Sequence, residues 1–400
     1  MSFILKVAIV FLALFDLSFK AAPILSTGKI IVATLSMYYF FKNRNKLPLF
    51  KSEAYVFIFY FFILAHVVLV FLLNGMPETT TMARMIYYFI YSIWLSFIFG
   101  AIFKDKSEFV KVLSVAIFVQ ACFVIVSWLS SDYRIIIDQL LVQTGNISLL
   151  SAKRPPGLMN SAGAKASVIL GIGSAFSLYQ LTLSQKRKSL VLYTIIMLVN
   201  LAATFIVGRT GLLLFLILAI SILIQRANKL ILNRSFFVII TTAFALIVLV
   251  GILIPVEFTQ NITYKVEWVL NEFSNGLFEA ETVLIIREMS IKELGMDTLI
   301  GTSRIRLPDG QHDSGYIQNY HSMGLIFAVI FYITVMTHIA SLLNMSRNSQ
   351  FVKENKLFLI ALILGLFIVE IKEPFILSYS YMLIILTLLK IPKYDRIKNL

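Results

Sequence analysis

The sequence predicts an all-α polytopic membrane protein, and composition is the first observation that does so. Of its 400 residues, 59% are hydrophobic and 14% are charged, whereas about a quarter of a soluble domain is charged. The second observation is the recurrence of apolar runs long enough to cross a bilayer. Together they exclude a disordered chain, a disulfide scaffold and an ordinary soluble enzyme. We expect residues 1–400 to form a single integral membrane domain.

About twelve transmembrane helices are expected, because a span needs about 20 mostly apolar residues. The segments are 3–19, 23–41, 54–73, 82–103, 110–130, 161–183, 190–207, 210–224, 235–255, 322–343, 357–369 and 375–390. Lys6 and Lys20 flank the first segment and Asp16 interrupts it, so we interpret it as a retained span rather than a cleavable signal peptide.

The net charge of +14 is the third observation, and it indicates orientation. In a soluble protein this excess would suggest nucleic acid, but Lys and Arg collect in the cytoplasmic loops of membrane proteins. One side, with the residues at its span ends, holds 21 of the 35 Lys and Arg residues. Its segments are 42–53, 104–111, 184–189, 225–234, 346–356 and both termini. We therefore place this side and both termini in the cytoplasm and expect no nucleic-acid partner.

Two outer loops, 131–160 and 256–321, are too long to be simple connections. Apolar residues recur at helical spacing over 133–141 and 258–273, and a third helix is expected over 281–294. Such amphipathic helices can lie on the membrane surface and cap a cavity.

Polar residues within or beside spans are costly and commonly functional, and here many map to the outer face. They are Arg84, Arg154, Lys165, Arg209, Arg287, Arg304, Arg306, His312, Asp313, His321, Glu370, Lys372 and Glu373. Cations that converge from several stretches of chain favour an anionic ligand such as a phosphate or diphosphate.

Two arginines stand in settings that restrict them. Arg154 precedes Pro155, Pro156 and Gly157, which fix the chain and allow close backbone approach; contact with lipid headgroups is the alternative. Arg209 separates two apolar runs with almost no loop, so it lines a cavity, pairs with another group or snorkels to the membrane surface.

The remaining polar positions leave their roles open. Arg287 lies on an apolar helix face, where a structural salt bridge is as good an interpretation as a substrate role. His312 is the candidate general base, because imidazole titrates near neutrality, and Asp313 is the alternative base. The charged turn 370–374 is either part of the functional site or simply an ion-paired turn between two spans. No metal-ligand spacing, phosphate-binding loop or nucleophile motif occurs, so we expect no metal and no cofactor.

Four short patterns resemble a known superfamily. They are Arg154-x-x-Gly157, Gly208-Arg209-Thr210, Arg287 in a long outer loop, and His312-Asp313-x-x-Tyr316 followed by Gly324. In this order, and with this topology over most of the chain, they resemble the O-antigen polymerase and O-antigen ligase superfamily (Wzy and WaaL types), closest to the polymerases.

The resemblance implies a GT-C-like helical bundle in the bacterial inner membrane, with a large late periplasmic loop. It implies an inverting, metal-independent glycosyltransferase that uses an undecaprenyl-diphosphate-linked oligosaccharide, with membrane lipids and a Wzz-type chain-length regulator as further partners. By the same matches, Arg154 and Arg209 bind the diphosphate and His312 is the base. The other expected site residues are Asp313, Arg287, Arg84, Arg304 and Tyr316.

The sequence also departs from the family. The usual His-Asn pair reads His312-Asp313, and the RX15G pattern of some polymerases occurs in neither long outer loop; Arg84 and Gly100 have that spacing but lie along a span. An O-antigen ligase, which transfers glycan to the lipid A core, is the first alternative. A flippase for the same lipid and a non-catalytic assembly protein are others, although charges crowded on one face favour an enzyme over a transporter.

Overall fold

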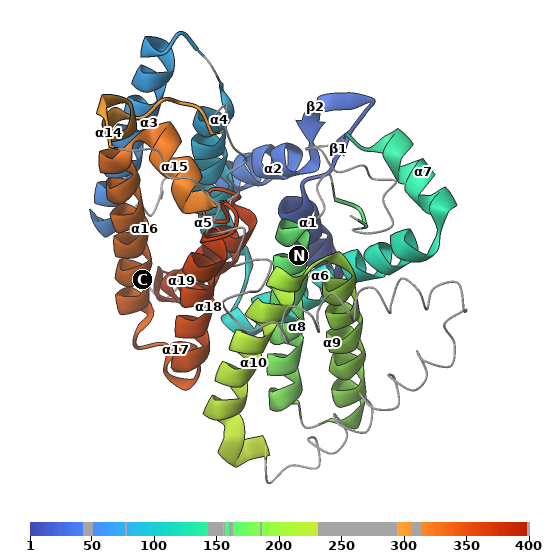
Figure 1. The fold of residues 1–400 in the computed structure, drawn as a ribbon. Helices are drawn as coiled ribbons and strands as arrows, with labels where there is room; N and C mark the ends of the chain where they lie inside the picture. Colours follow the sequence, from blue (N-terminus) through green and yellow to red (C-terminus); the bar gives the residue numbers. More distant parts are fainter. Residues whose placement is uncertain are drawn as a thin grey trace, which may run out of the picture. The chain divides into compact units, whose positions relative to one another are not determined.

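The computed structural model describes residues 1–42, 51–76, 78–142, 155, 157–159, 163–184, 186–230, 294–305 and 314–397. In these ranges the chain is mostly helical (Figure 1). Seven helices among the described residues are long and apolar enough to cross a membrane, judged by length and composition.

Each of these seven helices coincides with an expected span to within a few residues. They are α3 (Lys51–Leu73), the continuous helix Thr80–Ile102, α6 (Lys106–Leu129), α8 (Ala164–Leu183), α9 (Arg187–Val207), α10 (Arg209–Leu230) and α16 (Leu325–Ser346). The second of them is not uniform. It consists of α4 (Thr80–Tyr87), a π-helical segment η1 (Tyr88–Trp94) and α5 (Leu95–Ile102).

Four further described helices overlap expected spans but are not among these seven. They are α1 (Phe3–Phe15), α2 (Thr27–Lys42), α18 (Lys356–Glu370) and α19 (Ser380–Ile397). The expected span 235–255 lies outside the described residues, so the total of twelve stays a prediction.

The first expected span is shortened at Asp16. Helix α1 ends there because Asp16 adopts a left-handed conformation (φ 42°), and its carboxylate accepts a hydrogen bond from Gly28 N at 2.8 Å. A hairpin of β1 (Ser18–Phe19) and β2 (Ala22–Ser26) follows. The polar residue noted in the sequence therefore ends the helix instead of being carried within it.

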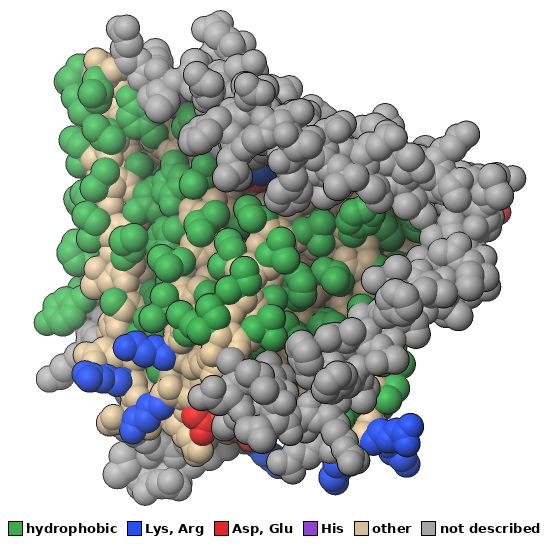
Figure 2. Space-filling view, turned by 60° about the horizontal axis from the view of Figure 1, so that its bottom comes forward, with side chains coloured by type: hydrophobic (Ala, Val, Ile, Leu, Met, Phe, Trp, Pro, Cys, Tyr) green, Lys and Arg blue, Asp and Glu red, His purple; other side chains and the backbone are tan. Residues whose placement is uncertain are grey.

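Hydrophobic side chains also cover the outside of the long helices. Along α3 and α16, Ile58, Phe62, Leu69, Val329 and Ile333 are all exposed. Figure 2 shows hydrophobic side chains gathered over much of one face, with Lys and Arg side chains along its lower edge. A helix that is apolar all round is typical of a membrane span, because lipid rather than water surrounds it.

The described chain groups into two compact units, and we describe each by itself. The first unit contains α1, the hairpin, α7 (Ser131–Leu140), α8, α9, α10 and most of α6. Helix α7 lies where the sequence predicts a helix over 133–141. It is tied to the hairpin by hydrogen bonds from Val142 N to Ser18 O and from Lys20 N to Leu140 O, both 2.8 Å.

Helices α8 and α10 of this unit approach each other through glycines. A Cβ atom on Gly211 would overlap the Ser167 carbonyl, and one on Gly171 would overlap the Gly211 carbonyl. The Ser167 hydroxyl accepts a hydrogen bond from Gly211 N at 3.2 Å. Small residues allow this backbone contact, as they do between membrane helices generally.

The second unit contains α3, the helix Thr80–Ile102, α16, α19, and most of α2 and α18. It also includes the short helices α14 (Met296–Ile300), α15 (Gly315–Met323) and α17 (Gln350–Glu354). Its core is rich in aromatic rings, and the hydroxyls of Tyr60 and Tyr88 hydrogen-bond at 2.9 Å.

Lys390 of α19, the last residue of the expected span 375–390, is fully buried in this core. Its Nζ donates to Ser96 Oγ at 2.9 Å and to Ile93 O at 3.2 Å, and lies 3.6 Å from the centre of the Phe97 ring. Ile93 belongs to η1, and π-helical segments are irregular in their backbone bonding, so Lys390 serves here as a buried partner for η1.

Candidate functional site

A buried polar cluster lies where α15 begins, in the second unit. We call it the Glu370 cluster, and it consists of Glu370, Tyr332, Asn319 and Tyr316. Tyr332 OH donates to Glu370 Oε1 at 3.1 Å and accepts from Asn319 Nδ2 at 2.7 Å. The rings of Tyr316 and Tyr332 lie 4.8 Å apart, and Tyr316 OH donates to Phe367 O at 3.0 Å.

Glu370 is the fully buried centre of this cluster. Burial raises the pKa of its carboxyl to about 7, because removal from water disfavours the charged form. Hydrogen bonds from Ile376 N (2.8 Å) and Tyr332, and the positive charge of Arg84, act in the opposite direction and are weaker. The pKa of Tyr316 is raised to about 12, first by burial and then by Glu370.

Gly315, the first residue of α15, packs directly on this carboxyl. A Cβ atom at this position would overlap Glu370 Oε1 and would come 2.7 Å from Pro374 Cα. The backbone at the start of α15 therefore packs against the Glu370 carboxyl, with no room for a side chain at position 315. In the sequence, α15 begins two residues after Asp313, and the His312–Asp313 pair lies outside the described residues.

Arg84 of α4 binds the same short helix. Its Nη1 donates to Gln318 Oε1 at 2.8 Å, and both side chains are at least half-buried. Three polar residues that the sequence singles out are thus gathered around α15, although they come from separate stretches of chain: Arg84, Tyr316 and Glu370. All three are expected on the outer face, and within the second unit the structure brings them together.

The junction between α15 and α16 is held by backbone contacts. Gly324 adopts φ +83° and Gly301 adopts φ +104°, and a Cβ atom on either would overlap the backbone of the facing segment. His66 of α3 lies beside this junction, with Nε2 at 2.8 Å from Ile300 O and 3.0 Å from Met323 O. Carbonyls only accept hydrogen bonds, so Nε2 carries the proton.

We expect Gly324→Ala to destabilise the protein by at least about 2 kcal/mol, because alanine is strained at this φ and its Cβ would overlap the backbone of Leu299 and Ile300. The measurement is the melting midpoint in detergent. Gly295→Ala is the matched control, since a Cβ atom there meets nothing within 4 Å. Equal midpoints for the two variants would contradict the tight junction.

Arg209 lies in the first unit, at the junction of two candidate membrane helices. Helix α9 ends at Val207 and α10 begins at Arg209, so one residue separates them, as the sequence predicts. The side chain is half-buried, and the contact of Gly211 with Ser167 fixes the backbone that carries it. The tight break expected between the two apolar runs is therefore present, and the role of the guanidinium stays a prediction.

The expected diphosphate residue Arg154 lies outside the described residues, but the chain just after it does not. Gly157 (φ +67°) sits against α6, where an added Cβ atom would come 2.7 Å from Gln120 Nε2. Leu158 N donates to Gln120 Oε1 at 3.3 Å. The close backbone approach expected at Gly157 is confirmed.

Several other expected positions also lie outside the described residues. They are Arg287, Arg306, His312, Asp313 and the segments 258–273 and 281–293. Arg304 is described and exposed, next to Ile305, whose N–H donates to Glu78 Oε2 at 3.2 Å. Within the described ranges no three His, Cys, Asp or Glu side chains gather as a metal-binding group would.

Sequence reasoning missed two parts of this site. His66 lies within an apolar run away from the expected outer cluster, yet it contacts α14 and α15, more than two hundred positions further along the chain. The sequence predicts that Glu370 is part of a charged turn, and the one sign of its burial is its position at the end of an apolar run.

Comparisons with known proteins give no match: no family model, no curated protein and no solved structure is similar to this chain.

Proposed function

We propose that this chain is an O-antigen polymerase. It would be a glycosyltransferase that moves an undecaprenyl-diphosphate-linked glycan onto another lipid-linked repeat unit at the periplasmic face. The observation that carries the proposal is the grouping of Arg84, Tyr316 and the buried Glu370 around α15, the helix that His312 and Asp313 precede. The seven long apolar helices support a substrate that resides in the membrane.

In the proposed reaction the acceptor sugar hydroxyl attacks the anomeric carbon of the donor. The bond from that carbon to the diphosphate oxygen breaks, the diphosphate leaves with the bonding electron pair, and attack from the opposite face inverts the configuration. Arg154 and Arg209 would hold the diphosphate and stabilise the charge that develops on it. His312 would accept the proton of the attacking hydroxyl, with Asp313 as the alternative base.

The residues around α15 act in this mechanism as positioning groups. Arg84 holds Gln318, and Glu370 holds the start of the helix through Gly315. A base that must meet a hydroxyl at hydrogen-bond distance needs a fixed backbone, because small displacements cost large factors in rate. Arg287 and Arg304 remain accessory substrate contacts in the proposal.

The test is deletion of the gene in its own bacterium, followed by analysis of the lipopolysaccharide. A polymerase predicts core bearing a single repeat unit. Bare core with accumulated lipid-linked polymer would show a ligase instead, and lipid-linked repeats retained on the cytoplasmic side would show a flippase. An unchanged ladder of long chains would refute all three.

A further inference from the structure

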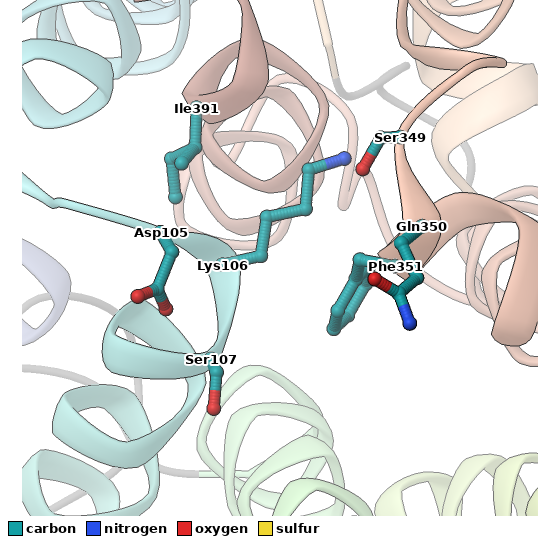
Figure 3. Close-up of a pocket in the computed structure, with 7 residues that line it drawn as sticks. All are labelled: Asp105, Lys106, Ser107, Ser349, Gln350, Phe351 and Ile391. Atoms are coloured by element: carbon teal, nitrogen blue, oxygen red, sulfur yellow. The ribbon is translucent and has the colours of Figure 1, made fainter. Parts of the chain in front are cut away.

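A cavity of about 240 Å³ lies in the second unit, and none of its lining residues belongs to the Glu370 cluster. It is lined from the start of α6 by Asp105, Lys106 and Ser107, from α17 and its N-cap by Ser349, Gln350 and Phe351, and from α19 by Ile391 (Figure 3).

Lys106 is the unusual member of this cavity. Its side chain is 4% exposed, and within the described part of the chain its Nζ has no hydrogen-bond partner. The Phe351 ring lies beside it, with its centre 5.4 Å from the nitrogen. A buried ammonium normally has an anion or several acceptors around it, because a ring face replaces only part of its lost hydration.

The neighbouring carboxylate is not that anion. Asp105 Oδ1 accepts a hydrogen bond from Glu108 N at 2.8 Å, and the carboxylate points away from the ammonium (Figure 3). The Lys106 nitrogen instead points toward Ser349, and the Gln350 amide borders the same space (Figure 3). The cavity thus presents one buried cation beside a hydroxyl that can donate a hydrogen bond, whereas the Gln350 amide nitrogen donates to Glu354 Oε1 at 2.7 Å.

We propose that this cavity binds a phosphate group, with the Lys106 ammonium as its counter-charge and the Ser349 hydroxyl as a hydrogen-bond donor. Phosphate suits the site because it is anionic and accepts several hydrogen bonds at once. The exposed cations Lys104, Arg347 and Lys353 stand within two residues of lining residues along the chain. They raise the local concentration of anions at the surface.

The phosphate can belong to an anionic phospholipid or to a soluble compound, and location favours the lipid. The segments 104–111 and 346–356 belong to the loops that the sequence analysis assigns to the basic, cytoplasmic side. The cytoplasmic leaflet is rich in anionic headgroups, which attract basic segments beside membrane helices. None of the residues that line this cavity belongs to the proposed enzymatic site.

The test uses the purified full chain in detergent and its melting midpoint. Phosphatidylglycerol is titrated against diacylglycerol, which lacks the phosphate, and sodium phosphate against sodium chloride at equal ionic strength. A higher melting midpoint with phosphatidylglycerol alone assigns the site to a lipid headgroup. A higher midpoint with sodium phosphate as well assigns it to soluble phosphates. No rise with either overturns the proposal.

Variants assign the binding to this cavity. Lys106→Met keeps the length of the side chain but removes the charge, and it should weaken phosphate binding at least roughly tenfold. Lys188→Met, at an exposed lysine on α9 that is not near the cavity-lining residues in the chain, is the matched control and should bind as wild type does. If Lys106→Met fails to fold, Ser349→Leu fills space beside the ammonium and should also abolish the rise. Wild-type affinity in the folded Lys106→Met variant, or in Ser349→Leu where the first does not fold, overturns the proposal.

Discussion

Replacing Arg209 with alanine is expected to abolish long-chain surface polysaccharide while the protein remains in the membrane. The side chain begins α10, one residue after α9 ends, and the backbone around it is fixed by the contact of Gly211 with Ser167. Alanine leaves that contact intact and removes only the guanidinium. Loss of a charge-assisted contact to a leaving diphosphate is expected to cost about a hundredfold or more in rate. The measurement is the lipopolysaccharide ladder, with membrane content checked in parallel.

Two further variants make this result specific. Arg209→Lys should restore only part of the long-chain material, because lysine keeps the charge but lacks the planar fork that binds two phosphate oxygens. Arg187→Ala is the matched control, since Arg187 is exposed and is the first residue of α9 as Arg209 is of α10. A wild-type ladder from Arg209→Ala would contradict the assigned role.

Replacing Glu370 with glutamine is expected to remove a pH dependence of stability. The pKa of the carboxyl is raised to about 7 in the folded protein, from an ordinary value of 4.5. A carboxyl with a raised folded-state pKa contributes stability that is fully present below 4.5 and is lost as the pH rises through about 7. Between pH 5 and 8 the free energy of unfolding of the wild type should therefore fall by roughly 2 to 3 kcal/mol, and that of the variant should not.

The groups that face Glu370 do not produce this effect themselves. Tyr316 stays neutral over the interval because its pKa is raised to about 12, and Arg84 stays charged. Apparent melting midpoints of wild type, Glu370→Gln and Glu373→Gln at several pH values measure the effect. Glu373 lies in the same turn, and its variant should follow the wild type. Parallel curves for wild type and Glu370→Gln would show that Glu370 does not titrate in this interval.

The sequence predicts the long helices well because their cause is local. A continuous apolar run of about 20 residues is sufficient for a span, and α8, α9 and α16 begin and end within a few residues of the expected limits. The break at Gly208 and the close approach at Gly157 are local as well, since each follows from a glycine in a restricted setting. The π-helical segment η1 has no such local cause, and the sequence does not reveal it.

Features that depend on distant contacts were not predicted. His66 bonds two carbonyls that come from α14 and α15, and no spacing in the sequence links them. Lys390 stands at the end of an apolar run, where a lysine normally faces water, but packing of α19 on α5 and η1 buries it. Glu370 neighbours Lys372 and Glu373, which made an exposed charged turn the natural interpretation; its burial arises from the packing of α15.

Reconstitution of the purified chain in proteoliposomes with undecaprenyl-diphosphate-linked repeat units as the sole substrate tests the central claim most directly. A polymerase predicts lipid-linked products of two or more repeats, with one undecaprenyl diphosphate released for each new glycosidic bond. Arg209→Ala should give neither product. The proposed function would be contradicted if folded wild-type protein left the repeat units monomeric. It would also be contradicted if the repeat units only crossed the bilayer.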